Sequence, residues 1–125
     1  MYLVAVNLNN PKDMAASQAT EGRLLRIGRK PERLPEESVH LVRITWNDRL
    51  VSRNHCEAVR HGSSLKQSRL PALTGRSTPN ALYSTAPPRD REVLPEPITL
   101  HYGDSVTIGA KGTTAIFWLR TLQDL

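Results

Sequence analysis

The chain is poor in the residues that build disulfides, aromatic clusters and membrane spans. Cysteine occurs once among 125 residues, as Cys56, and aromatic residues make up only 5%. A single cysteine excludes an internal disulfide and fits a reducing compartment, so we expect a cytoplasmic protein. No apolar run approaches the roughly 18 residues of a membrane-spanning helix. The opening "MYLVAVNLNN" lacks the basic leader of a signal peptide. We therefore expect no membrane partner.

Residues suited to metal binding or catalysis are also too few or too scattered. The four histidines show no metal-ligand spacing, and Cys56 has no second cysteine with which to hold an ion. Ser52 and His55 lie close in sequence, but no G-x-S-x-G motif surrounds the serine as it does in one class of hydrolase. We therefore expect no metal, no cofactor and no catalytic residue.

Positive charge is what the chain has in excess. The formal net charge is +5, the pI is near 9.9, and 13 of the 17 basic residues are arginine. Arginine grips phosphate and carboxylate with a planar fork of donors, so the excess favours an acidic or phosphorylated partner. A nucleic-acid-binding domain is one alternative, although no aromatic residues interleave with the basic ones to stack on bases. A basic surface that only keeps the protein soluble is another.

The pattern of apolar residues predicts a single all-β domain. Most segments are short and bounded by turn residues, and no window of helical length sustains an apolar period of 3.6 residues. A chain of this length can bury a core without disulfides or metals. The predicted strands are residues 2–6, 23–27, 40–45, 55–60, 64–69, 81–83, 98–100, 105–108 and 113–119.

Two of these segments support further predictions. In the last strand, "TTAIFWLRT", isoleucine and tryptophan share one face, and phenylalanine and leucine share the other. Because both faces are apolar, this strand should lie inside a sheet. In "LHYGDSVTIG" apolar residues alternate on both sides of a Gly-Asp turn pair, which predicts a β-hairpin.

Two proline-rich stretches predict surface loops. The first is "RKPERLPEESVH", in which both prolines stand among charged residues. The second, "RSTPNALYSTAPPRDREVLPEP", holds five of the nine prolines and is interrupted only by the short strand at 81–83. Long loops on a rigid scaffold often carry binding residues.

The segment "DRLVSRNHC", residues 48–56, gathers polar side chains at one connection between two strands. A solvated loop is one explanation, and a loop that holds an anion is the other, because an anion needs several donors in a small volume. The polar residues stand around two aliphatic ones and are Arg49, Ser52, Arg53, Asn54 and His55.

Four fragments taken together resemble the forkhead-associated (FHA) domain, a phosphothreonine-binding β-sandwich. They are "LLRIGR" ending at Arg29, "VSRNH" at 51–55, "GRSTPN" at 75–80 and "LHYGDSVTIG" at 100–109. The family pattern is Gly-Arg after a strand, Ser-x-x-His, a Ser/Thr-Asn loop, and Gly-Asp before an aliphatic strand and Ile-Gly. Three of these four blocks match in full. The resemblance implies a two-sheet β-sandwich of about eleven strands (FHA/SMAD-like) over residues 1–121. Residues 122–125 would be a tail that leads toward a downstream region.

The resemblance also implies roles for individual residues. Arg29 and Ser52 would bind the phosphate, and Arg53 would add a second cation. His55 would turn inward and hydrogen-bond the backbone of its own loop. The remaining residues with structural roles would be Gly28, Gly103 and Asp104.

One block departs from the family pattern. The usual Asn-Gly-Thr loop is absent, and "GRSTPNALY" stands in its place. Asn80 is the candidate to bind the peptide backbone, with Ser77 or Thr78 as the donor before it. Pro79 stiffens this loop and can shift its register.

The function implied by the resemblance is non-catalytic binding of phosphothreonine in proteins that Ser/Thr kinases modify. Phosphothreonine should bind better than phosphoserine. An FHA-like domain that makes phosphate-independent protein contacts is an alternative because of the altered asparagine loop. Nucleic acid is the less favoured partner.

Overall fold

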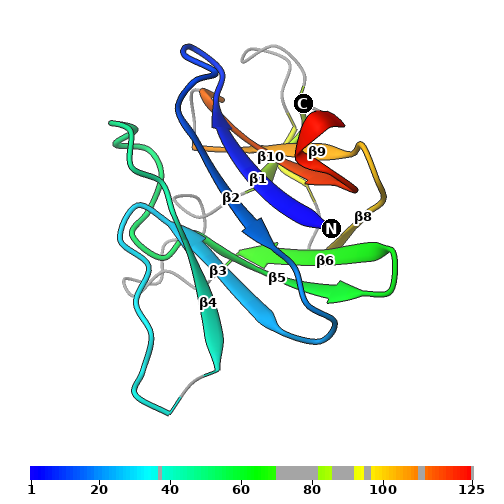
Figure 1. Ribbon diagram of the computed structural model, residues 1–125. Coiled ribbons are helices and arrows are strands. Elements are labelled where there is room, and N and C mark those ends of the chain that lie inside the picture. The colour runs from blue at the N-terminus through cyan, green and yellow to red at the C-terminus, as the bar shows by residue number, and fades with distance from the viewer. Residues whose placement is uncertain (37, 70–81, 86–91, 95–96, 110–111, 125) are drawn as a thin grey trace.

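Ten strands form two five-stranded sheets in the computed structural model, which describes residues 1–36, 38–69, 82–85, 92–94, 97–109 and 112–124 (Figure 1). In spatial order the first sheet consists of β2 (Met14–Gln18), β1 (Tyr2–Asn7), β10 (Thr114–Leu119), β9 (Ser105–Ile108) and β7 (Leu82–Tyr83). The second consists of β4 (Val39–Arg43), β3 (Leu24–Gly28), β5 (Cys56–His61), β6 (Ser64–Arg69) and β8 (Ile98–Leu100). A short 3₁₀ helix, η1 (Leu122–Asp124), follows the last strand.

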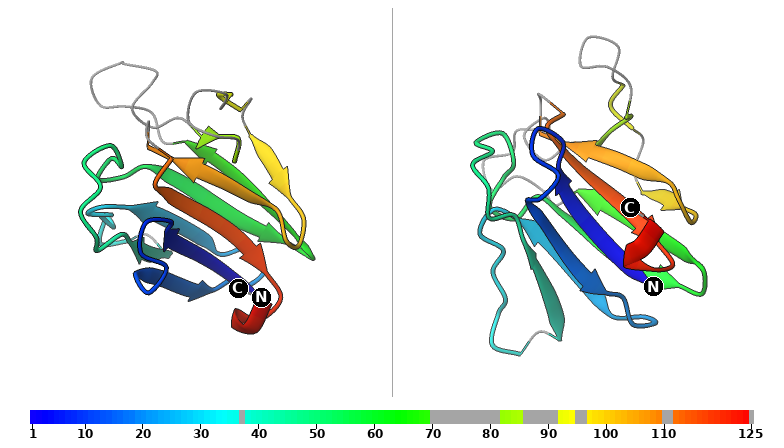
Figure 2. Two further views of the ribbon diagram at one scale, coloured as in Figure 1. Left: turned by 90° about the horizontal axis from the view of Figure 1, so that it is seen from above. Right: turned by 45° about the horizontal axis from the view of Figure 1, so that its top comes forward.

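The prediction of an all-β, two-sheet sandwich is confirmed. The sheets form two layers (Figure 2), and the ten described strands come close to the expected eleven. Among the described strands every pairing is antiparallel except that of β3 with β4. Within the described part of the chain no helix has the length and apolar character to cross a bilayer.

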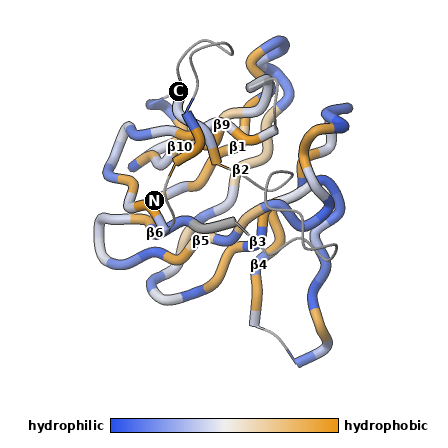
Figure 3. The backbone as a smooth tube through the Cα atoms, turned by 180° about the vertical axis from the view of Figure 1, so that it is seen from behind, coloured by the Kyte–Doolittle hydropathy of each residue, from blue (hydrophilic) through white to orange (hydrophobic). Residues whose placement is uncertain are grey.

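The core lies between the inner faces of the two sheets. Leu3 of β1 and Trp118 of β10 come from the first sheet, and Ile27 of β3 and Leu65 of β6 come from the second. All four are fully buried. Hydrophobic residues lie along the strands, whereas the connections are mainly hydrophilic (Figure 3). Burial of each such side chain stabilises the fold by about 1.5 to 3 kcal/mol.

The last strand lies inside its sheet, as predicted. β10 pairs with β1 on one side and with β9 on the other. Its inner face adds Ile116 and Trp118 to the core. Its outer face places Phe117 and Leu119 against Val4 of the neighbouring strand in a second apolar cluster. The two apolar faces therefore each have a packing partner.

The prediction of a hairpin over residues 100–109 is wrong. β8 and β9 belong to different sheets, because Leu100 pairs with Leu65 of β6 and Ser105 pairs with Phe117 of β10. The turn between them therefore carries the chain from one layer of the sandwich to the other.

The local chemistry of this turn is that of a hairpin turn. Asp104 Oδ2 accepts a hydrogen bond from His101 N at 2.9 Å, and Gly103 has the left-handed φ of 84°. A tertiary contact determines which sheet the chain enters after the turn. The ring of Tyr102 stacks on that of Trp118, with 6.0 Å between the ring centroids. A Gly-Asp pair supplies a turn but does not specify which sheet receives the next strand.

Strand β2 was not predicted. Its sequence, "MAASQ", has no β-branched or aromatic residue, so its strand propensity is low. It forms because five of its residues pair along β1, with Ala16 opposite Val4 at the centre. The ends of the other strands lie within two residues of their predicted positions.

The strand connections gather at two ends of the sandwich. The loops that follow β1, β3 and β4, and the start of β10, lie at the left in Figure 1. The β5–β6 and β8–β9 turns lie at the opposite end. The segments around Arg29 and Ser52 are both at the first of these ends.

Candidate functional site

Main-chain hydrogen bonds join the end of β3 to the connection between β4 and β5. Arg29 N donates to Ser52 O at 3.0 Å, and Lys30 N donates to Arg53 O at 3.1 Å. These bonds fix the separation of two segments that are more than twenty residues apart in sequence. The structure therefore brings together the backbones of the three predicted phosphate-binding residues, Arg29, Ser52 and Arg53.

Gly28 permits this close approach. A β-carbon placed on Gly28 would lie 1.9 Å from the carbonyl oxygen of Arg53, nearer than any real Cβ contact. Its φ is not in the left-handed region, so the need for glycine is steric. The carbonyl oxygen of Gly28 also accepts a hydrogen bond from Ile44 N at 2.8 Å. The glycine before Arg29 therefore sets the distance between the two loops.

The guanidinium of Arg29 is braced against the facing loop. Its Nε donates to Val51 O at 3.2 Å. Its Nη1 and Nη2 have no partner within the described part of the chain, and the residue is exposed. A guanidinium held at one nitrogen keeps its outer fork available for two oxygens of a phosphate or carboxylate.

His55 holds the turn that carries Ser52. Its side chain is fully buried, and Nδ1 accepts a hydrogen bond from Ser52 N at 3.0 Å. The backbone N–H of His55 donates to the carbonyl oxygen of Ile27 at 2.8 Å. The imidazole thus points into the protein and fixes the backbone of the turn.

Both backbone polar groups of Glu32 are bound by side chains. The N–H of Glu32 donates to Asn54 Oδ1 at 2.9 Å, and its carbonyl oxygen accepts from Arg26 Nη1 at 2.6 Å. Arg26 is itself paired with Glu57 Oε1, at 3.1 Å from Nε and 2.9 Å from Nη2. The loop that follows Arg29 is therefore fastened to the β4–β5 loop and to the sheet. Nothing in the spacing of these residues predicts this arrangement.

The remaining predicted residues are not gathered at this site. Gly103 and Asp104 form the β8–β9 turn at the opposite end of the sandwich, where Asp104 O accepts from Trp118 N at 3.1 Å. The positions of the predicted asparagine loop, Ser77, Thr78 and Asn80, lie outside the described residues.

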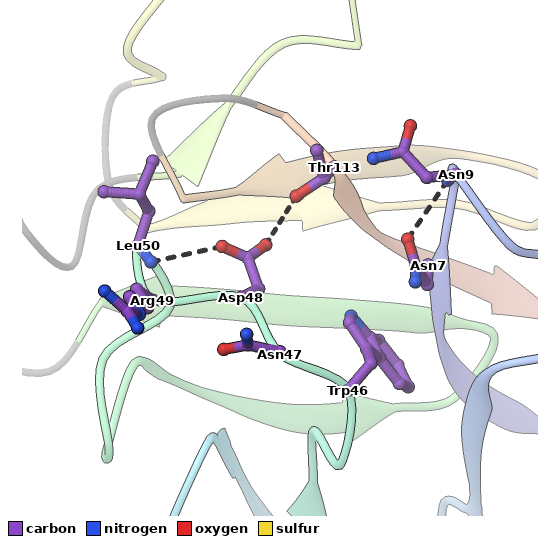
Figure 4. Close-up of a pocket in the computed structure, with 8 residues that line it drawn as sticks. All are labelled: Asn7, Asn9, Trp46, Asn47, Asp48, Arg49, Leu50 and Thr113. Carbon is purple, nitrogen blue, oxygen red and sulfur yellow. Dashed lines mark hydrogen bonds between the residues drawn. The ribbon is translucent and has the colours of Figure 1, made fainter.

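A buried carboxylate orders the first half of the β4–β5 loop, and we did not predict its role. Asp48 is 7% exposed, and its carboxylate accepts three hydrogen bonds. The donors are Leu50 N at 3.1 Å and Thr113 Oγ1 at 2.6 Å, both drawn in Figure 4, and Thr114 Oγ1 at 2.8 Å. The bond from Leu50 is a local Asx turn, which the Asp-x-Leu spacing could have suggested. The two threonines come from the other sheet and could not have been inferred.

A polar pocket of about 280 Å³ lies beside this carboxylate (Figure 4). Asn7 and Asn9 line it from the end of β1 and the loop beyond, and Arg49 and Leu50 line it from the β4–β5 loop. The pocket is at the same end of the sandwich as Arg29. It extends the polar surface of that end.

The groups at the two joined loops suit an anion better than a metal ion. Within the described residues, no three side chains of His, Cys, Asp or Glu are grouped so as to hold a metal. The exposed side chains at the joined loops include those of Arg29, Lys30 and Arg53. Guanidinium and ammonium groups are donors only, so they can bind the oxygens of a phosphate.

The fold is similar to that of two solved structures. One is the crystal structure of the FHA domain of the CT664 protein from Chlamydia trachomatis, with a TM-score of 0.62 and 16% identity. The match covers 96% of this chain and 97% of that one. The other is the Slr1951 protein from Synechocystis sp., with a TM-score of 0.58, 17% identity and the same two coverages. No protein-family model and no curated protein matches the sequence.

Proposed function

Because the chain has the FHA-domain fold, we propose that it is a non-catalytic module that binds phosphothreonine in partner proteins. In this role it would connect Ser/Thr kinases to the assembly of the proteins they modify. Residues 1–121 would form the binding module.

The observation that carries the proposal is the braced guanidinium of Arg29 beside the turn at Ser52 and Arg53. A phosphothreonine has about −1.5 to −2 charges and three acceptor oxygens, so its site needs several fixed donors. Arg29 would bind two phosphate oxygens through Nη1 and Nη2. Ser52 would donate through its hydroxyl, and Arg53 would supply a second cation.

The peptide backbone would be bound by a different loop. By resemblance to the family, Asn80 would hydrogen-bond the peptide next to the phosphothreonine, with Ser77 or Thr78 before it. Pro79 separates Thr78 from Asn80, whereas the family pattern has serine or threonine directly before the asparagine.

Binding of phosphothreonine peptides to Arg29→Ala and Arg23→Ala tests the proposal. Loss of Arg29 removes a charge-assisted donor from a partly desolvated anion, which costs about 2 to 5 kcal/mol, or tens to thousands of fold in affinity. Arg23 is exposed at the other end of the same strand. Because Arg23 would lie at most at the rim of the site, Arg23→Ala should weaken the free energy of peptide binding by about 1 kcal/mol or less. Fluorescence anisotropy measures both, and circular dichroism verifies that the variants fold.

The same titration separates the alternative functions. A nucleic-acid binder would lose affinity similarly in both variants, with the salt slope reduced by about one unit for each phosphate contact removed. A phosphate-independent module would bind the unphosphorylated peptide as well as its phosphorylated twin. Arg29→Ala that is folded and binds as tightly as the wild type would refute phosphate recognition at this site.

A finer expectation is that phosphothreonine binds better than phosphoserine in the same peptide. The difference comes from burial of one methyl group, worth roughly 1 to 3 kcal/mol at most. Isothermal titration calorimetry of the two peptides measures it. Equal affinities would mean that the "GRSTPN" loop forms no niche for the methyl group.

A further inference from the structure

The two joined loops carry more positive charge than one phosphothreonine neutralises. Segments 28–33 and 52–54 contain four cations and one carboxylate, which gives a formal charge of +3. A phosphothreonine brings about −1.5 to −2, so about one positive charge or more is left over. The charged residues are Arg29, Lys30, Glu32, Arg33 and Arg53.

Lys30 is held at the edge of the site with its charge unneutralised. Its backbone N–H is bonded to Arg53 O at 3.1 Å, and two residues later Glu32 is bound on both sides by Asn54 and Arg26. Lys30 is exposed and has no ion-pair partner within the described part of the chain. The backbone at Lys30 is therefore fixed beside Arg53, while the ammonium group remains available to a ligand.

The backbones of Lys30 and Arg53 are adjacent, so two cations start from neighbouring points of the site and favour a second anion there. Two unit charges of the same sign about 4 Å apart in water repel by about 1 kcal/mol, and the repulsion grows where the dielectric is lower. A single phosphate can be bound through Arg29 and Arg53. Lys30 then still has no counter-charge within the described part of the chain, unless the peptide supplies one.

We propose that Lys30 binds a second anionic group, a carboxylate or a phosphate, on the peptide that carries the phosphothreonine. An extended peptide advances about 3.5 Å per residue, so this group lies within about two residues of the phosphothreonine. The inference rests on the proposed function and adds a class of ligand to it: peptides with a second negative charge close to the first. Lys30 is then a residue that determines specificity, whereas Arg29 binds the phosphate itself.

A double-mutant cycle between Lys30 and the peptide tests this. One peptide series carries a central phosphothreonine and a Glu at position −2, −1, +1 or +2, and a matched series carries Gln. We expect the wild type to bind one Glu peptide about two- to fivefold more tightly than its Gln counterpart, the range of an exposed ion pair. Lys30→Gln should lose this discrimination and still bind the Gln peptide. Lys66→Gln, at an exposed position of β6, should keep it.

A third peptide identifies the source of the second charge. Phosphoserine replaces the Glu at the preferred position. A larger gain with phosphoserine, lost in Lys30→Gln, assigns Lys30 to a second phosphate, and an equal gain means that a carboxylate suffices. Either result supports the inference.

The failure of the inference differs from that of the proposed function. Equal binding of Glu and Gln peptides at all four positions, or discrimination that persists in Lys30→Gln, would overturn the role of Lys30. Phosphate recognition would stand in that case if Arg29→Ala still lost affinity. Absence of binding to any of the phosphopeptides would overturn both.

Discussion

Arg26 and Arg29 lie three residues apart in the sequence, and the structure uses them in opposite ways. The side chain of Arg26 is 14% exposed and all three of its nitrogens are bound, to Glu57 and to the backbone of Glu32. Arg29 is exposed and only its Nε is bound within the described part of the chain. One arginine is part of the scaffold, and the other presents donors to solvent.

The difference between them shows what an excess of arginine does and does not indicate. An arginine whose donors are all satisfied by the protein cannot bind a ligand without losing structure. An arginine braced by one bond has its geometry fixed and its remaining donors unused, which is the preorganised condition for anion binding. The number of internal partners, and not the number of arginines, therefore distinguishes an arginine that is part of the scaffold from one whose donors are available to a ligand.

Replacing the residue between the two arginines should have the largest effect on stability. Gly28→Ala places a β-carbon against the backbone oxygen of Arg53, which cannot rotate away. We expect a loss of about 3 kcal/mol in the free energy of unfolding, the upper end for an overpacked site. Urea denaturation followed by circular dichroism measures it.

Gly22→Ala is the matched control for Gly28→Ala. Gly22 has a left-handed φ of 72° but no atom near its missing side chain. Its replacement should cost only about 1 to 2 kcal/mol, the conformational penalty alone. Equal losses in the two variants would contradict the steric role of Gly28.

Arg26→Ala should lower the free energy of unfolding by less than Gly28→Ala does. Arg26→Ala leaves the partly buried Glu57 and the carbonyl of Glu32 without their donor, which we expect to cost about 1 to 2 kcal/mol. Arg29→Ala should stay within about 0.5 kcal/mol of the wild type. Thermal and urea denaturation of both variants check this contrast.

The double variant Arg26→Met with Glu57→Met separates charge from packing. Replacing a buried ion pair by apolar residues of similar size is often neutral, and the pair of Arg26 and Glu57 is largely shielded from solvent, so much of the lost stability should return. If Arg29→Ala destabilises the protein as much as Arg26→Ala, the distinction between the two arginines is wrong.

A small and local loss of stability is expected at Asn54, which binds the other side of Glu32. Asn54→Ala removes one neutral hydrogen bond, worth about 0.5 to 1.5 kcal/mol. The amide hydrogen of Glu32 should exchange with solvent faster, while exchange in the core strands should hardly change. NMR hydrogen exchange measures both.

Asn54→Asp retains an oxygen acceptor at the same position and serves as the control. It should restore the protection of the Glu32 amide. Unchanged exchange in Asn54→Ala would mean that the loop after Arg29 is held by the remaining contacts without Asn54.

The sequence predicted those parts of the fold that depend on local alternation and turn chemistry. It gave the position of β10 inside a sheet because both of its faces are apolar. It could not predict β2, whose small residues form a strand only because β1 offers an edge. It also misplaced β8 and β9 relative to each other, since the stacking of Tyr102 on Trp118 is a contact between distant segments.

The candidate site also combines features that local motifs predict with contacts between distant segments that they do not predict. The segments "LLRIGR" and "VSRNH" are short motifs, so the sequence could nominate Arg29 and Ser52 as candidate phosphate-binding residues. The attachment of Glu32 and the bonds of Asp48 to Thr113 and Thr114 join residues from different parts of the chain. No spacing in the sequence encodes such contacts, and only the folded chain reveals them.

The pairing of the first strand with the last has a consequence for synthesis on the ribosome. β1 is hydrogen-bonded to β10, with Tyr2 opposite Leu119, so one of its partners is made more than a hundred residues after it. Translation proceeds at about 5 to 20 residues per second, so the chain spends several seconds with this edge of β1 unpaired. Pairing between such distant segments is also slow in itself. The nascent chain therefore has one edge of β1 without its partner until β10 has been made, and the complete sandwich forms only after translation has passed β10.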